Sequence, residues 1–389
     1  MSAVGRRDPI PNAVPYLGGK EWEYLKECLD TNWVSSAGPF VARFEAALAE
    51  WHGVPHAVAT VNGSAALHVA LLAAGVGPGD AVLVPAFTFI ATANAVAYCG
   101  AQPILLDCEA TSWGLDAARA EAFLARECER RPAGLVHRAS GLVIRALLPV
   151  HLYGHPFDVD AVVALAGRWS LPLVEDSAEA LGAEYRGRRA GADGLLSCLS
   201  FNGNKIVTAG SGGAVLTRDA AAAARARALT TQARGDAVEF VHEGIGYNYR
   251  LSNLHAALGC AQLEQLEAAV ASKRATVAYY REALAGEEGV EVFAEASWAR
   301  STYWMSSILL DERRCPDVRG LIRALDAERI GARPLWRPLH QQPVFAGAPR
   351  DQLPVSERLY DRGLSLPCSV GITDGERAAV VEALLARLR

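Results

Sequence analysis

"HAVATVNGSAALHVALLAAGVGPGDAVLVPAFTFIATANAVAYCGAQPILLDC", residues 56–108, decides the fold. Short apolar runs alternate in it with longer segments of helical pattern. The expected strands are 56–61, 81–87 and 101–108, and the expected helices between them are 63–75 and 88–100. Strands that are apolar throughout and alternate with helices indicate a parallel sheet covered on both faces.

The same alternation continues on both sides of this stretch. Residues 1–20, rich in Pro and Gly, predict an extended arm, and one long helical pattern at 251–286 leads into a smaller unit. Further helices are expected at 21–30, 40–52, 158–170, 221–229, within 318–331 and within 376–389, and further strands within 141–154 and at 171–177, 290–295 and 302–310. We therefore expect an α/β fold with an arm (1–20), a large domain (21–265) that holds a mixed, mostly parallel sheet, and a small C-terminal α/β domain (266–389).

Composition excludes several classes of protein. The 389 residues are 51% hydrophobic and 21% charged, with a net charge of −5, and no long basic run indicates nucleic-acid binding. The eight cysteines form no C-x-x-C motif, which predicts reduced thiols in a cytoplasmic protein. We expect no signal peptide, no membrane span and no metal site, since His52, His56 and His137 lack ligand spacing.

Residues at the carboxyl ends of parallel strands are the candidates for ligand binding. "NGSAALH", 62–68, opens a helix after a strand, so its N–H groups could bind a phosphate or simply form a tight turn. Phe87 could stack on a flat ring or fill the core. Asp176 follows Glu175 at the end of an apolar strand and could hold a ring nitrogen protonated or cap a helix.

Lys205 ends "SFNGNK", 200–205, in surroundings of apolar and small residues. A desolvated lysine amine can attack a carbonyl to form a Schiff base, whereas an ordinary lysine would extend to solvent. The nearby Gly210, Gly212 and Gly213 favour close approach of a ligand to the backbone. The four strand-end features together fit pyridoxal 5′-phosphate (PLP), while a nicotinamide cofactor fits less well because no G-x-G-x-x-G follows a strand.

The order of these motifs resembles one family over essentially the whole chain. "NWVSSAGPFVARFE", "NGSAALH", "PAFTFIATANAV", "PVHLYGHPFDVD", "VEDSAEALGA", "SFNGNK" and "GYNYRLSNLHAALG" are similar to the DegT–DnrJ–StrS sugar aminotransferases, which are PLP enzymes of fold type I. A branch of this family that dehydrates has histidine at the lysine position, so Lys205 favours amino transfer.

The resemblance implies a role for each matching residue. Lys205 would be the Schiff-base lysine and proton shuttle, and Asp176 would pair with the pyridine nitrogen. The other cofactor contacts would be Phe87 on the ring, Glu179 beside it, the backbone of Ser64 and Ala65 and the hydroxyl of Ser200 at the phosphate, and Asn248 at the phosphate of a neighbouring subunit. The last contact implies a homodimer with shared active sites.

The resemblance also implies the substrates. Thr88 and Tyr153 would lie near the pocket, and a loop with Trp336, Arg337 and His340 suits a nucleotide diphosphate and its base, or is a surface loop. The expected reaction moves an amino group from L-glutamate to C4 of a UDP-linked 4-keto-6-deoxy N-acetyl hexose, as in bacillosamine and legionaminic acid routes. Alternatives are a 3-keto sugar or keto-cyclitol acceptor, a non-catalytic PLP-binding regulator, and a nicotinamide-dependent sugar oxidoreductase.

Overall fold

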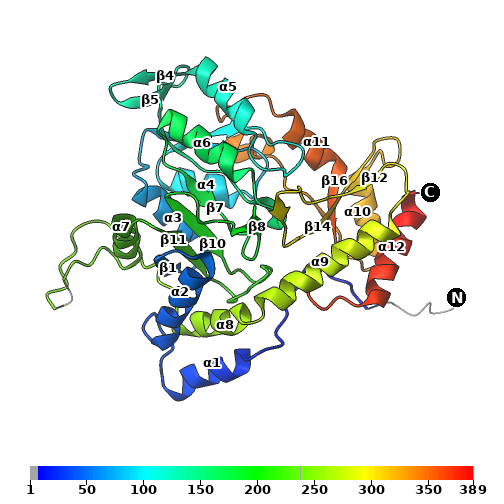
Figure 1. Cartoon of the computed structure of the whole chain (residues 1–389), viewed down its shortest axis with the longest axis horizontal. Helices are drawn as coiled ribbons and strands as arrows, with labels where there is room; N and C mark the ends of the chain where they lie inside the picture. Colours follow the sequence, from blue (N-terminus) through cyan, green and yellow to red (C-terminus); the bar gives the residue numbers. More distant parts are fainter. Residues whose placement is uncertain (1–7, 237, 389) are drawn as a thin grey trace.

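A computed structural model describes residues 8–236 and 238–388 and has the expected α/β class (Figure 1). The helices are α1 (Glu21–Asp30), α2 (Pro39–His52), α3 (Gly63–Ala73), α4 (Ala91–Tyr98), α5 (Ala117–Glu127), α6 (Val159–Trp169), α7 (Ala220–Thr230), α8 (Asn253–Leu263), α9 (Leu266–Ala283), α10 (Val318–Ala327), α11 (Pro354–Arg362) and α12 (Asp374–Leu388). Short 3-10 turns are η1 (Leu152–Gly154), η2 (Leu339–Gln341) and η3 (Pro343–Phe345).

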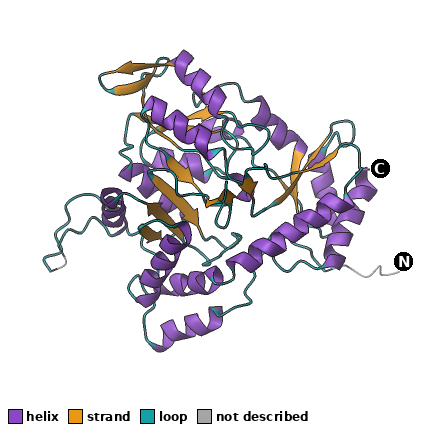
Figure 2. Cartoon of the chain, viewed as in Figure 1, coloured by secondary structure: helices purple, strands orange, loops and turns teal. Residues whose placement is uncertain are grey.

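The described strands form four sheets, and helices surround the sheets in the middle of the molecule (Figure 2). The strands are β1 (His56–Thr60), β2 (Asp80–Pro85), β3 (Gln102–Leu106), β4 (Cys128–Arg131), β5 (Gly134–His137), β6 (Val143–Leu147), β7 (Val174–Asp176), β8 (Glu184–Tyr185), β9 (Arg188–Arg189), β10 (Leu196–Ser200), β11 (Gly213–Thr217), β12 (Val290–Val292), β13 (Ala299–Arg300), β14 (Ser306–Leu310), β15 (Arg333–Pro334) and β16 (Gly363–Leu366). Every residue of β2 is buried, as expected for a strand covered on both faces.

The two large sheets are mixed, as expected, with both parallel and antiparallel strand pairs. One sheet has the order β1-β11-β10-β7 and another has β3-β2-β6-β5-β4, and the bridges Leu147 to Leu173 and Val150 to Asp176 join them. β2 is parallel to β3 and β6, and β10 is parallel to β7, but β11 is antiparallel to both of its neighbours. The short 201–212 connection carries no crossover helix, so β11 must return antiparallel. Lys205 lies in that connection.

The long helix expected at 251–286 was wrong as a single element. It is broken at Glu264 and Gln265 into α8 and α9, which follow one another across the molecule in Figure 1. The Gln265 side chain donates hydrogen bonds to Glu21 Oε1 and Ala261 O, which fixes the non-helical turn. The break lies next to the expected domain boundary at 265, and the division into domains stays a prediction.

The C-terminal part has its own sheet and also returns to the large sheet. Its strands have the order β12-β14-β16-β15, and Ile10 of the N-terminal arm bridges to Ile330 beside them. The segment after β15 then crosses back, since the N–H of Leu339 donates to Ala86 O at 2.8 Å. This crossing brings the 335–345 loop to the end of β2. No helix in residues 8–236 and 238–388 is long and apolar enough to cross a membrane.

Candidate active site

A cavity of about 270 Å³ lies at the strand ends that the sequence singled out. Its walls come from the turn before α3, the segment after β2, the end of β7, the 200–205 segment and two tryptophans from the C-terminal half. The lining residues are Asn62, Gly63, Ser64, Leu67, Thr88, Phe89, Ala91, Val150, Asp176, Ala178, Glu179, Ser200, Asn202, Asn204, Lys205, Trp304 and Trp336. Among the predicted site residues, the cavity therefore gathers Ser64, Thr88, Asp176, Glu179, Ser200, Lys205 and Trp336.

One end of the cavity is a helix N-terminus suited to an anion. Asn62 caps α3 by accepting the N–H of Ala65 at 2.8 Å, and Ala65 is absent from the cavity wall, so the contact expected between the Ala65 N–H and a phosphate stays a prediction. Gly63 and Ser64, which directly precede Ala65, line the cavity. A Cβ on Gly63 would lie 2.7 Å from Ser200 Cβ, so only glycine lets the Ser200 hydroxyl approach this turn. Backbone N–H groups and a hydroxyl thus converge as a phosphate requires.

Asp176 is a buried carboxylate held by two donors. Its Oδ2 accepts the Thr92 hydroxyl at 2.7 Å and its Oδ1 accepts the N–H of Ala178 at 3.1 Å. Thr88 reaches the same group through a 3.0 Å contact between the Thr88 and Thr92 hydroxyls. Burial nevertheless raises the pKa of Asp176, because these bonds and the charge of Lys205 only partly offset the lost hydration. The carboxylate is therefore positioned for a cationic partner in the cavity.

Lys205 extends into the same cavity. Its Nζ lies 3.5 Å from Glu179 Oε1 and 3.9 Å from the centroid of the Trp304 ring. Glu179 is buried, and burial raises its pKa while Lys205 and the N–H of Tyr153, at 2.7 Å from Oε2, act in the opposite direction. Sequence reasoning named Glu179 but missed Trp304, which lies 99 residues further along the chain.

The structure places Phe89 in the cavity wall, two positions after Phe87, the residue predicted to stack on the ring. Phe87 is fully buried, is absent from the cavity wall and meets Trp113 and Tyr153 edge-on in the core. Phe89 lines the cavity and lies 5.0 Å from Trp336 between ring centroids. The chain turns from β2 into α4 here, so the first aromatic of "FTF" packs inward and the second faces the cavity.

The 335–345 loop contributes one of its three predicted residues to the cavity. Trp336 lines it, and the backbone N–H of Trp336 donates to the Tyr153 hydroxyl at 2.8 Å, so Tyr153 supports the wall from behind. Arg337 and His340 face α11, where Arg337 contacts Tyr360 and His340 Nε2 lies 3.0 Å from Glu357. A part for these two in nucleotide binding outside the cavity stays a prediction.

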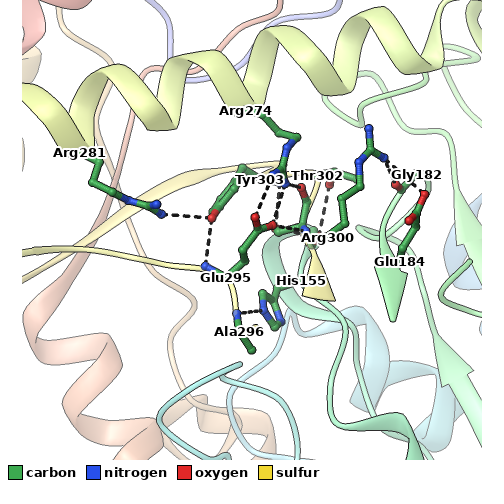
Figure 3. A network of polar contacts seen from close by, with 12 residues as sticks. His155, Gly182, Glu184, Arg274, Arg281, Glu295, Ala296, Arg300, Thr302 and Tyr303 are labelled. Carbon is green, nitrogen blue, oxygen red and sulfur yellow. Dashed lines mark hydrogen bonds and ion pairs between the residues drawn. The ribbon is translucent and has the colours of Figure 1, made fainter. Parts of the chain in front are cut away.

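A network beside the cavity fixes the segment that presents Trp304 (Figure 3). Arg274 of α9 pairs with both carboxylate oxygens of Glu295 at 2.7 and 2.8 Å. Arg281 and the N–H of Glu295 both donate to the Tyr303 hydroxyl, and the Ala296 N–H is 3.0 Å from His155 Nε2. The residues before Trp304 are thus bonded to α9 on one side and to the segment after η1 on the other.

The other carboxylate at the end of β7 has a supporting role. Glu175 accepts from the N–H groups of Asp193 and Gly194 and lies 2.8 Å from His151 Nε2, with both side chains fully buried. These bonds consume both Glu175 oxygens. Asn248, in contrast, is exposed and lies off the cavity of its own chain, in a loop that projects beside α7 (Figure 1). Its predicted contact with a neighbouring subunit's phosphate stays a prediction.

The cavity matches the chemistry of PLP in three respects. A helix N-terminus with Ser200 can hold a phosphate, a buried carboxylate can pair with a pyridinium nitrogen, and a shielded lysine amine lines the same cavity. Among the described residues no cluster of His, Cys, Asp and Glu could hold a metal ion. These features define the class as an α/β enzyme of the PLP-dependent aminotransferase fold.

The comparisons with known proteins agree with this class. A model of the DegT/DnrJ/EryC1/StrS aminotransferase family matches residues 15–385. The GDP-perosamine synthase of Caulobacter vibrioides is 39% identical over 96% of this chain and 97% of its own length. EpsN of Bacillus subtilis, which carries the name of a pyridoxal phosphate-dependent aminotransferase, is 39% identical over 95% of this chain and 94% of its own. The crystal structure of a DegT DnrJ EryC1 StrS aminotransferase from Brucella abortus superposes with a TM-score of 0.86 at 30% identity, covering 95% of both chains.

The chain belongs to the DegT/DnrJ/EryC1/StrS aminotransferase family. It is a sugar aminotransferase and its cofactor is PLP, as the sequence predicted. This membership overturns the two alternatives from other classes, a nicotinamide-dependent oxidoreductase and a non-catalytic regulator.

Proposed function

We propose that the enzyme transfers an amino group from L-glutamate to C4 of a nucleotide-linked 4-keto-6-deoxy sugar. The observation that carries this proposal is the convergence of Lys205, Asp176 and the α3 N-terminus on one cavity. The two half-reactions would follow each other, with the keto acid leaving before the sugar enters. A 3-keto sugar or a keto-cyclitol is the alternative acceptor.

The residue roles follow from the cavity wall. Lys205 would hold the cofactor covalently through Nζ, and the same atom would move the proton between substrate and cofactor carbons. Asp176 would pair with the ring nitrogen, with Thr92 and Ala178 keeping the carboxylate in place. When bound, PLP supplies an electron sink for the bond electrons of the reacting carbon.

The remaining cofactor contacts are proposed from the same geometry. The N–H groups of Gly63 and Ser64 and the hydroxyl of Ser200 would hold the phosphate. Phe89 would cover the ring in place of Phe87, and Glu179 would stay beside Lys205. Thr88 and Trp336 would meet the sugar where it enters the cavity.

A homodimer with shared active sites is part of the proposal. The loop around Asn248 exposes a run of apolar side chains, which is costly in water unless another surface covers it. Its exposed apolar residues are Val238, Phe240, Val241 and Ile245. Asn248 on this loop would reach the partner's phosphate site. We also propose a cytoplasmic enzyme, which the eight buried free thiols support.

The nucleotide defines two candidate substrates. The motif resemblance favours a UDP-linked N-acetyl hexose of the bacillosamine or legionaminic acid type. A GDP-linked sugar is the second candidate, favoured by the name of the Caulobacter relative at 39% identity.

The test is incubation with L-glutamate and a panel of UDP- and GDP-linked 4-keto and 3-keto 6-deoxy sugars, followed by mass spectrometry of the products. An amino sugar from a UDP-linked 4-keto substrate, lost in Lys205→Ala, is the expected result. Product from GDP-linked substrates alone would select the second candidate. Product only from a 3-keto substrate would refute the C4 assignment, and cofactor-loaded enzyme without any amino sugar product would refute the proposal.

A further inference from the structure

The amine of Lys205 has two partners on the cavity wall. Its Nζ lies 3.9 Å from the centroid of the Trp304 ring and 3.5 Å from Glu179 Oε1, and its side chain is only 13% exposed. An ammonium over the face of an indole is the strongest of the common cation–π pairs, and it gains strength where water is excluded. The carboxylate and the ring approach the same atom from different elements.

The Trp304 ring is held firmly in this position. Its indole N–H donates to the carbonyl of Asn204 at 2.8 Å, and Asn204 immediately precedes Lys205. Its own carbonyl accepts from the buried Nζ of Lys273 at 3.0 Å, and its ring is nearly parallel to that of Tyr153, with an interplanar angle of 16°. The ring is therefore tied to the backbone of the lysine it faces.

Glu179 is equally constrained. Its second oxygen accepts the N–H of Tyr153, so the first oxygen can only face Lys205. The titratable groups facing the Lys205 amine are Asp176 at the end of β7 and Glu179 three residues later, and Lys273 binds the carbonyl of Trp304. Tyr153, behind both partners, has a pKa raised by burial and stays neutral.

We propose that Trp304 and Glu179 form a dock for the ε-ammonium of Lys205 whenever the lysine is detached from the cofactor. Trp304 is then a positioning residue, since it acts through Lys205. The dock keeps the detached amine within the cavity until it has returned the proton that it carries. The inference rests on the covalent role proposed above for Lys205.

The sequence allows a direct test on cofactor-free protein. Lys20, Lys26, Lys205 and Lys273 are the only lysines of the chain, and the first two are exposed internal standards. Acetic anhydride reacts only with uncharged amines, so labelling of the Lys205 peptide across a pH series, read by mass spectrometry, reports the fraction that is ammonium. A change in access scales the rate at every pH, whereas loss of the dock moves the profile along the pH axis.

The variants are Trp304→Leu, Trp304→Phe and Glu179→Gln. In Trp304→Leu the Lys205 labelling midpoint should fall by about one pH unit, because a desolvated cation–π contact is worth about 1–2 kcal/mol. Phe keeps a weaker aromatic face and should restore part of the shift, and Glu179→Gln should lower the midpoint without removing the ring. Trp298→Leu is the matched control, since Trp298 packs on Tyr185 and His155 outside the cavity and should leave the midpoint unchanged.

An unchanged midpoint in folded Trp304→Leu would overturn the dock. If Trp304→Leu does not fold, Trp304→Phe and Glu179→Gln decide, and no shift in either would overturn it. A separate experiment on wild-type holoenzyme distinguishes failure of the dock from failure of the proposed function. Borohydride fixation of cofactor on Lys205 with an unshifted labelling profile refutes only the dock, whereas fixation elsewhere refutes the proposed function.

Discussion

Thr92 holds the carboxylate that we propose as the partner of the cofactor's ring nitrogen, and Thr92→Val tests this proposal directly. The Thr92 hydroxyl is buried and donates to Asp176 Oδ2 at 2.7 Å. Valine keeps the shape and removes the donor, so Asp176 keeps only the N–H of Ala178. Burial already raises the pKa of Asp176, and loss of this bond should raise it further.

The magnitude follows from the type of bond. A hydrogen bond to a charged group contributes about 1.5–3 kcal/mol, and each 1.4 kcal/mol is a factor of ten. We expect PLP to bind Thr92→Val about tenfold to a hundredfold more weakly at neutral pH. As pH falls, Asp176 takes up a proton and loses its charge, so the pH below which affinity drops should move upward by about one to two units in this variant.

The assay is an absorbance titration of cofactor-free protein with PLP between pH 5 and 9. Thr92→Ser keeps the hydroxyl and should bind within a few-fold of wild type. Equal affinity in Thr92→Val and wild type across the pH range, with unchanged thermal stability, would refute the assigned role of Thr92.

Three further variants probe other parts of the site. Gly63→Ala places a Cβ 2.7 Å from Ser200 Cβ and should weaken PLP binding in the same titration. Its control is Gly167→Ala, in open space on α6, which should keep the affinity and stabilise the fold by about 0.5–1 kcal/mol; equal PLP affinities of the two variants would contradict the phosphate site proposed at Gly63 and Ser200. Phe89→Leu should weaken PLP binding about twofold to tenfold with little change in Tm. Phe87→Leu should cost about 1–3 kcal/mol of stability at unchanged PLP affinity, and the reverse pattern would identify Phe87 as the residue that stacks on the ring. Asp176→Asn should bind PLP at least thirtyfold more weakly. The Tm of the cofactor-free variant at pH 8 should nevertheless equal or exceed that of wild type, because a carboxyl whose pKa is raised by folding makes the protein less stable as pH rises; a lower Tm at pH 8 would contradict the raised pKa of Asp176.

The layout of the fold could be predicted because it depends on local pattern. Apolar runs at β1, β2 and β3 and the helices between them are visible in the sequence, and the strand ends then nominate Asp176 and Lys205. Family membership and PLP followed from the order of those motifs and are confirmed.

The predictions that failed and the residues that were missed depend on contacts between residues far apart in the sequence. Nothing at Glu264 and Gln265 resembles a helix stop, since the break depends on a bond to Glu21. Both aromatics of "FTF" are apolar, so periodicity at a strand end did not tell which one faces the cavity. Thr92 and Trp304 carried no signal because their importance comes from Asp176 and Lys205, which lie 84 and 99 residues away from them in the sequence.

The identity of the covalently linked lysine tests the central claim most directly. Holoenzyme is reduced with borohydride, digested and mapped by mass spectrometry, before and after incubation with L-glutamate. We predict cofactor fixed on the Lys205 peptide of the resting enzyme, and loss of this fixation after L-glutamate has detached the lysine. Cofactor on Lys273, or fixation on Lys205 that L-glutamate leaves unchanged, would contradict the account.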